Sequence, residues 1–166
     1  MLNSDANRAA VISHFPSLAT DNDFEIVRGT NPDYNCIAWA ACYDNVWWEP
    51  LPENKRPITR FDGVVFDWPF DAPSNSKVET LIGIFKNKRY ETCNDGNIEN
   101  GYRKICFYGN DIDNITHASR QFIGGKYHGK WTSKLGASFE IIHGTPYTIE
   151  STEYGNVLQF MKVKFP

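Results

Sequence analysis

One apolar segment constrains the fold of this chain more than any other feature. Residues 37–42, Ile-Ala-Trp-Ala-Ala-Cys, lie in a stretch from Asp33 to about Asn45 that has the composition of a helix. Asp33 or Asn35 can cap its N-terminus with a side-chain oxygen. Because a helix that is apolar on most sides is buried, the other elements of the chain must surround this one.

The remaining sequence places helices before strands. Residues 4–15 predict a short amphipathic helix with Ser4 as its N-cap, and the capping box of residues 76–79 opens another helix. Strands are expected at five places: 24–27, 103–108, 114–122, 129–134 and 157–164. Helices followed by a sheet define an α+β fold, and a length of 166 residues fits one domain spanning 1–166.

Residues 46–75 follow no regular pattern. The segment holds five prolines and begins next to the pair Trp47-Trp48. A stretch of this length without regular structure is uncommon in a compact domain and is often functional. We therefore expect residues 46–75 to border the functional site.

Charge and composition exclude several classes of partner. A net charge of −3 argues against a protein that binds nucleic acid or an anionic membrane without specificity. No apolar run approaches the ~18–20 residues that cross a bilayer, and residues 1–8 lack the features of a signal peptide. We expect a cytoplasmic protein with free cysteines, and delivery by a specialised secretion system is also compatible with this sequence.

Motifs for a cofactor or a metal are absent from the sequence. It has no Gly-rich phosphate loop, no Cys-x-x-Cys pair and no Cys/His pair with the spacing of zinc ligands. We therefore expect neither a cofactor nor a metal. The expected substrate or partner is a protein or a peptide.

Cys36 is the first candidate for chemistry. It stands at the start of the predicted buried helix, where unpaired amides and the helix dipole stabilise an anion. Since the thiolate is the nucleophilic form of cysteine, this position predicts a lowered pKa and the most reactive thiol of the chain. The competing interpretation, favoured for an isolated cysteine, is a small residue packed in the core.

His117 is the second candidate. It lies in the middle of the strand expected at 114–122, next to small residues that leave room for a helix N-terminus. A cysteine at the start of a buried helix with a histidine on a later strand is the papain-type arrangement, in which His117 would govern the ionisation of Cys36. The competing interpretation is an ordinary hydrogen-bonded histidine, and His143 is the alternative partner.

A cysteine–histidine pair usually needs a third group that orients the imidazole. If Gln121 pairs with Lys130 across a hairpin, residue 134 lies opposite His117, and a slip of one residue places Ser133 there. Thr132 is the neighbouring alternative. A hydroxyl at this point is a weaker orienting group than the side chain of Asn or Asp.

Four further residues are candidates for contacts with a substrate. The side chains of Asn35 and Asn31, together with the Cys36 amide, can donate hydrogen bonds to an oxyanion. Trp47 and Trp48 can stack on a peptide or a sugar. The competing interpretation is that these two rings fill the core beneath the irregular segment.

The motifs of the chain, in their order, resemble a family of uncharacterised, mostly bacterial proteins. They are YNCIAWA at 34–40, WW followed by Pro50, THASRQ at 116–121, GKWTSKLG at 129–136, His143 and Tyr154-Gly155. More distantly, NCIAWA is similar to the nucleophile helix of CHAP amidases and NlpC/P60 peptidases, where a cysteine begins a helix and a histidine follows on a strand. This resemblance implies a papain-like fold and transfers the catalytic roles to Cys36 and His117. The third polar residue of those families has no clear counterpart here.

These observations predict a cysteine-dependent hydrolase or acyl-transfer enzyme of the peptidase, amidase or deamidase class. The alternative is a non-enzymatic binding, adaptor or immunity protein on a degenerate papain-like scaffold, in which Cys36 is buried and inert. A third interpretation is a carbohydrate-binding domain, which requires exposed and coplanar Trp faces.

Overall fold

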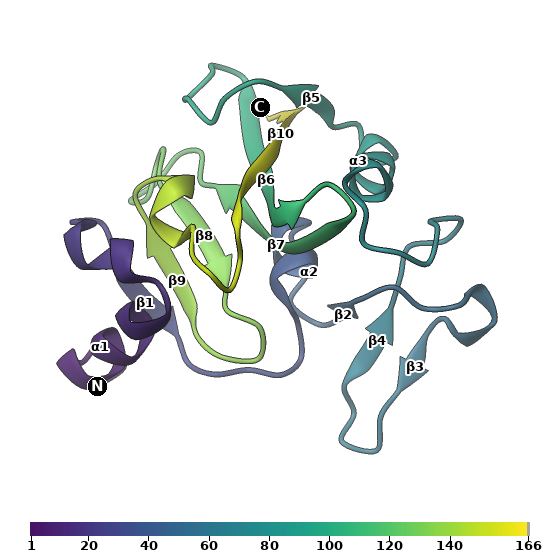
Figure 1. The fold of residues 1–166 in the computed structure, drawn as a ribbon, viewed down its shortest axis with the longest axis horizontal. Coiled ribbons are helices and arrows are strands. Elements are labelled where there is room, and N and C mark those ends of the chain that lie inside the picture. The colour runs from purple at the N-terminus through teal and green to yellow at the C-terminus, as the bar shows by residue number, and fades with distance from the viewer. Residues whose placement is uncertain (166) are drawn as a thin grey trace.

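The computed structural model describes residues 1–165, which form a large antiparallel sheet with helices around it (Figure 1). Its seven strands lie in the order β1-β9-β8-β7-β6-β10-β5. They are β1 (Glu25–Arg28), β5 (Glu91–Cys93), β6 (Tyr102–Asp111), β7 (Asn114–Gln121), β8 (Trp131–Lys134), β9 (Glu140–His143) and β10 (Asn156–Lys164). The predicted α+β class is confirmed; the short strand β5 was not expected.

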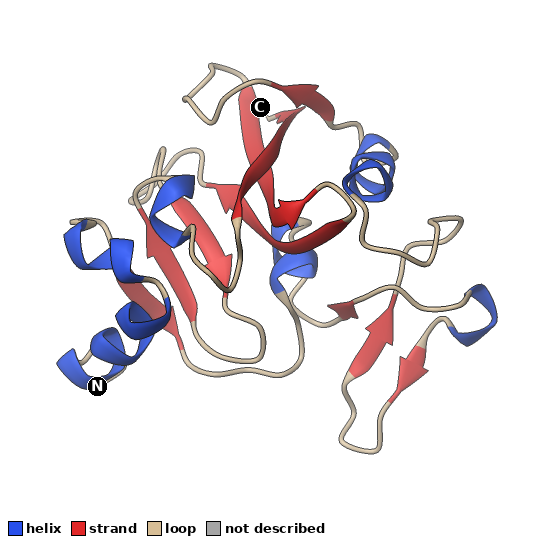
Figure 2. Cartoon of the chain, viewed as in Figure 1, coloured by secondary structure: helices blue, strands red, loops and turns tan. Residues whose placement is uncertain are grey.

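The helices are short and lie around the sheet (Figure 2). They are α1 (Asp5–His14), α2 (Cys36–Ala40) and α3 (Val78–Lys86), with the 3-10 turns η1 (Pro16–Thr20), η2 (Glu53–Lys55) and η3 (Pro146–Ile149). Ser4 caps α1 as predicted, since its side chain accepts a hydrogen bond from the Asn7 amide. The predicted capping box at 76–79 is wrong. Asn75 instead accepts from the Lys77 amide and the Thr80 hydroxyl before α3.

Helix α2 is the buried helix that the apolar segment predicts, but it is much shorter. Its N-cap is Asn35, whose side chain accepts from the Ala38 amide, and Ile37, Ala38 and Ala40 are buried. The helix ends because Cys42 adopts a left-handed conformation with a φ of 70°. The Tyr43 amide then donates to the Ala38 carbonyl and closes the last turn.

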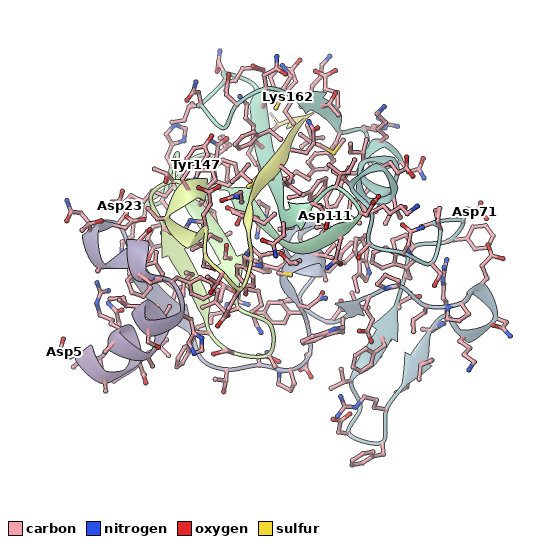
Figure 3. The ribbon with its side chains drawn as sticks, in the orientation of Figure 1. Asp5, Asp23, Asp71, Asp111, Tyr147 and Lys162 are labelled. Carbon is pink, nitrogen blue, oxygen red and sulfur yellow. The ribbon has the colours of Figure 1, made fainter. Side chains whose placement is uncertain are left out.

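Residues 46–75 are not irregular throughout, as the sequence predicted, but carry a second small sheet. It consists of β2 (Trp47–Trp48), β4 (Val65–Asp67) and β3 (Ile58–Thr59), in that order. Arg56 holds the surrounding loop, since its guanidinium donates to the carbonyls of Leu51, Pro69 and Ala72. This unit projects from the main sheet (Figure 1), and Asp71 beyond β4 lies at the opposite end of the long axis from Asp5 in α1 (Figure 3).

The two faces of the main sheet carry two separate apolar cores. Side chains alternate along a strand, so Phe107 on β6 and its partner Ala118 on β7 face the core that contains α2 and α3. The next pair, Tyr108 and His117, lies on the opposite face; Tyr108 belongs to the core beside α1. Strand β7 therefore separates the two cores.

The hairpin between β7 and β8 forms as predicted, with Gly124–Gly125 in its loop, but its register is one residue away from the prediction. Gln121 pairs with Trp131 instead of Lys130. The Gly129 amide donates to the Phe122 carbonyl and the Phe122 amide donates to the Lys130 carbonyl, so two residues oppose one. This bulge, with Gly129 at a φ of +81°, shifts the register by one position.

No helix within residues 1–165 is long and apolar enough to span a membrane.

Candidate functional site

Cys36 opens helix α2 and lies at the base of the first core. Only 9% of its surface is exposed. Burial raises the pKa of the Cys36 thiol to about 11, and hydrogen bonds from the backbone amides of Ala118, Ile37 and Cys36 itself oppose this shift. The lowered pKa expected from the helix N-terminus is therefore wrong, because desolvation outweighs the dipole of a five-residue helix.

The strand next to Cys36 is open on one side. Strand β7 pairs with β8 only at Arg120 and Gln121, so the edge of β7 before these residues is free of the ladder. The amide of Ala118 is therefore available to the Cys36 sulfur. Ala118 follows His117 directly in β7, so the thiol lies next to the backbone of the strand that carries the second candidate residue.

His117 is completely buried, and its two ring nitrogens differ. Nε2 lies 3.0 Å from the Ser133 hydroxyl, whereas Nδ1 is buried and has no hydrogen-bond partner within residues 1–165. Burial lowers the pKa of His117 well below its ordinary value. The imidazole is therefore neutral at neutral pH and has one unused nitrogen.

Tyr154 covers His117 and lies near Cys36 as well. Its ring stacks on the imidazole with the centroids 3.9 Å apart and an interplanar angle of 7°. Burial, and secondarily the charge on Cys36, raises the pKa of Tyr154 well above its ordinary value. Tyr154 thus contacts His117 and lies within electrostatic range of Cys36.

Within the described residues, Cys36 and His117 share no hydrogen bond. His117 projects to the face of β7 that carries Tyr108, whereas Cys36 packs in the core on the other face. The two side chains therefore lie on opposite faces of β7, and what joins Cys36 to this strand is the Ala118 amide at its open edge. In this resting arrangement they are a neutral thiol and a neutral imidazole.

Ser133 lies beside His117 despite the shifted register. It stands directly opposite Ser119, with 2.7 Å between the hydroxyl oxygens, and reaches His117 diagonally. Its hydroxyl also lies 2.8 Å from Nε2 of His143, the alternative partner. The predicted third group is thus in contact with the imidazole, as part of a buried polar network.

Lys134 does not lie opposite His117, where the expected register placed it, and its burial was not predicted. Its side chain is fully buried, donates to the carbonyls of Asn31 (2.7 Å) and Gly136 (2.5 Å), and lies 4.6 Å from the centre of the Tyr34 ring. Burial lowers the pKa of Lys134 to about 8, and the charge on Cys36 is the first of the opposing causes. A buried cation is therefore placed on the Cys36 side of β8. Its signal is a lysine within a strand of otherwise uncharged residues.

The candidate substrate-binding residues mainly stabilise the fold in this arrangement. Asn35 caps α2 and exchanges hydrogen bonds with the backbone of Trp48, while the side-chain oxygen of Asn31 accepts from the Asp33 amide. Trp48 is buried, and Trp47 packs against Phe66 at 5.9 Å between ring centres.

All four cysteines are free; Cys36 and Cys106 are buried, and Cys42 is exposed. Within residues 1–165, no three side chains of His, Cys, Asp or Glu are grouped as the ligands of a metal ion.

The fold and this site define an α+β domain with a buried cysteine, histidine and serine around one strand of an antiparallel sheet. Comparison with known families identifies the group of proteins. The domain of unknown function DUF7689 matches residues 25–162, and the chain belongs to this family. The match agrees with the expected membership in an uncharacterised family. The searches of curated proteins and of solved structures found no match.

Proposed function

We propose that this protein is a cysteine-dependent hydrolase or acyl-transfer enzyme acting on an amide or thioester of a protein or peptide. Cys36 would be the nucleophile, His117 the base and Ser133 the group that orients the imidazole. The scaffold would be papain-like, with the cysteine helix α2 packed on the strands that carry His117 and Ser133.

The unused nitrogen of His117 is the observation that carries this proposal. A buried ring nitrogen without a partner costs free energy, and native proteins rarely leave one. Here Nε2 is held by Ser133 and Nδ1 is free, and the Cys36 thiol contacts the amide of the next residue of the strand. This division, with one nitrogen oriented and the other available, is what a general base requires.

The proposed reaction begins from the neutral pair. The Cys36 thiol transfers its proton to Nδ1 of His117, and the sulfur attacks the carbonyl carbon of the substrate. His117 then protonates the leaving amine or thiol, which departs and leaves an acyl group on Cys36. Attack by water releases the acid, whereas attack by another amine completes an acyl transfer.

One observation favours the alternative, a binding protein on a degenerate scaffold. Cys36 is nearly closed to solvent, and burial raises its pKa to about 11, so the resting thiol is unreactive. In such a binding protein, Cys36 and His117 would contribute only packing to the two cores. The carbohydrate-binding interpretation finds no such support, because Trp48 is buried and Trp47 packs against Phe66.

Mass spectrometry of an acyl-enzyme separates the two proposals. Protein in a Cys42→Ala background is incubated with a panel of peptide thioesters and p-nitroanilides, and the acyl adduct is located by peptide mapping. We expect the adduct on Cys36, and about a 10²-fold lower rate of its formation in His117→Gln. An adduct that forms equally fast in His117→Gln, or no adduct with any acyl donor, would favour the binding protein.

A further inference from the structure

A chain of buried hydrogen bonds continues from His117 on the side away from Cys36. Ser133 Oγ lies 3.0 Å from His117 Nε2 and 2.8 Å from His143 Nε2. His143 Nδ1 lies 2.7 Å from the carbonyl oxygen of Thr145. His117, Ser133 and His143 have no exposed surface, so no solvent reaches the chain through them.

We propose that His143 is a positioning residue which, through Ser133, holds His117 in the tautomer with its proton on Nε2 and its lone pair on Nδ1. This inference rests on the proposed function, because the tautomer matters for chemistry only if His117 is the base for Cys36.

The carbonyl of Thr145 can only accept a hydrogen bond. Nδ1 of His143 must therefore carry a proton and donate it. A neutral imidazole has one N–H, so Nε2 of His143 is an acceptor. The single proton of the Ser133 hydroxyl is then directed to His143 Nε2.

The assignment of a single N–H to the His143 ring requires a neutral imidazole. His143 is neutral under ordinary conditions. Burial lowers the pKa of His143 to about 4, opposed by the hydrogen bond to Thr145 and by the charge of Asp21. The carboxylate of Asp21 is itself occupied by the Gly144 amide at 2.8 Å and the Thr148 hydroxyl at 2.7 Å. It therefore makes no direct bond that would hold a second proton on the ring.

The direction of the Ser133 hydroxyl determines the tautomer of His117. With its proton given to His143, the Ser133 oxygen can only accept, from His117 Nε2 and from the Ser119 hydroxyl at 2.7 Å. The Ser119 proton then goes to this shorter contact rather than to the Tyr108 hydroxyl at 3.1 Å, whose own proton goes to the Pro146 carbonyl. One donated and two accepted bonds use the full capacity of a hydroxyl. The opposite tautomer would leave no proton between Nε2 and Ser133 and would bury an Nδ1–H without an acceptor.

This arrangement prepares the base without a rearrangement during the reaction. The lone pair on Nδ1 accepts the thiol proton of Cys36, and Nε2 keeps its bond to Ser133 throughout. No proton behind His117 has to move when the imidazolium forms. The hydrogen bond to His143 thus fixes the direction of the Ser133 O–H bond, whereas an isolated hydroxyl could rotate.

Nitrogen NMR of the resting protein tests the tautomer without any substrate. The protein is labelled with ¹⁵N-histidine, and the His14→Leu and His128→Leu variants help to assign the four ring systems. We expect His117 to show a protonated Nε2 and an unprotonated Nδ1. In His143→Leu the Ser133 proton is no longer held by His143 and can turn to His117. Part of the His117 population should then carry its proton on Nδ1, despite the missing acceptor there, whereas His143→Gln restores an acceptor oxygen and the original tautomer.

A kinetic readout shows whether the tautomer matters for the reaction. With an acyl donor that modifies Cys36, His143→Leu should lower the acylation rate at pH 7 by about 10²-fold. His143→Gln should stay close to the unaltered protein, and His14→Leu is the control for the same substitution at an exposed histidine.

The proposal is overturned if the unaltered protein carries the proton on Nδ1, or if folded His143→Leu keeps the original tautomer. If His143→Leu does not fold, Ser133→Ala serves instead, and an unchanged tautomer in that variant contradicts the relay. If the tautomers behave as expected but no donor acylates Cys36, the proposed function fails and the relay stands.

Discussion

At the scale of single residues, the exposed Cys42 and the buried Cys36 should react with small reagents at different rates. We expect iodoacetamide at pH 7 to modify Cys42 first, because Cys36 is only 9% exposed and its pKa is raised to about 11. Peptide mapping after short labelling times measures the order. Faster labelling of Cys36 at pH 7 would mean that its thiolate is already present and accessible.

Because His117 is buried, its removal should lower the stability of the fold. A histidine lining an open cleft contributes little packing, whereas this ring is fully buried, stacks on Tyr154 and bonds to Ser133. We expect His117→Ala to lower the free energy of unfolding by about 3 kcal/mol. Urea denaturation measures the loss, with His128→Ala in the exposed hairpin loop as the control. Equal stabilities of the two variants would contradict the buried stack.

At the scale of elements, Asn35 joins helix α2 to the small sheet. Its side chain accepts from the Ala38 amide and exchanges two hydrogen bonds with the Trp48 backbone, at 2.6 and 3.0 Å. We expect Asn35→Ala to cost about 2–3 kcal/mol, because it removes a helix cap and leaves buried backbone groups unpaired. Ser4→Ala, which removes only the cap of α1, should cost about 1 kcal/mol. Similar losses in thermal or urea unfolding would show that Asn35 is only a cap.

Elements with strong local signals could be predicted from the sequence. The cap at Ser4, the glycine-containing hairpin loop and the long strands β6, β7 and β10 depend on nearby residues, and the structure has them close to the expected positions. Strands of two or three residues, such as β2 and β4, are too short to show a period. They exist because they pair with each other, and Trp48 of β2 also bonds to Asn35.

The candidate site was only partly predictable for the same reason. Ser133 could be placed near His117 from the hairpin, since a register error of one still leaves a diagonal contact. His143 contacts Ser133 through the pairing of β8 with β9, which local patterns do not reveal. The position of Tyr154 depends on the close approach of Gly155 to the Gly109 backbone, where a side chain would not fit.

At the scale of the whole molecule, the buried histidines should make the fold sensitive to acid. The pKa of His143 falls from an ordinary 6.5 to about 4 in the folded state, so below pH 6.5 the unfolded chain binds a proton that the folded chain does not. Stability is therefore lost as the pH falls from 6.5 to about 4, by about 3 kcal/mol for this residue.

Urea denaturation at a series of pH values measures this loss. The lowered pKa of His117 adds to it in the same direction. His143→Gln should weaken the dependence of the free energy of unfolding on pH. His14→Gln, at the exposed pair with Glu153, should leave the contribution of the buried histidines unchanged. A stability that stays constant from pH 7 to pH 4 would show that the histidines are not buried as neutral groups.

The pH profile of Cys36 acylation, in the Cys42→Ala background with and without His117→Gln, tests the central claim most directly. Because burial keeps His117 neutral, the rate in the protein with His117 should persist below pH 6.5, and the variant should be about 10²-fold slower at pH 7. The two rates should converge near pH 11, where the thiol ionises without a base. Profiles that overlap at every pH would contradict the proposed transfer of the thiol proton to His117.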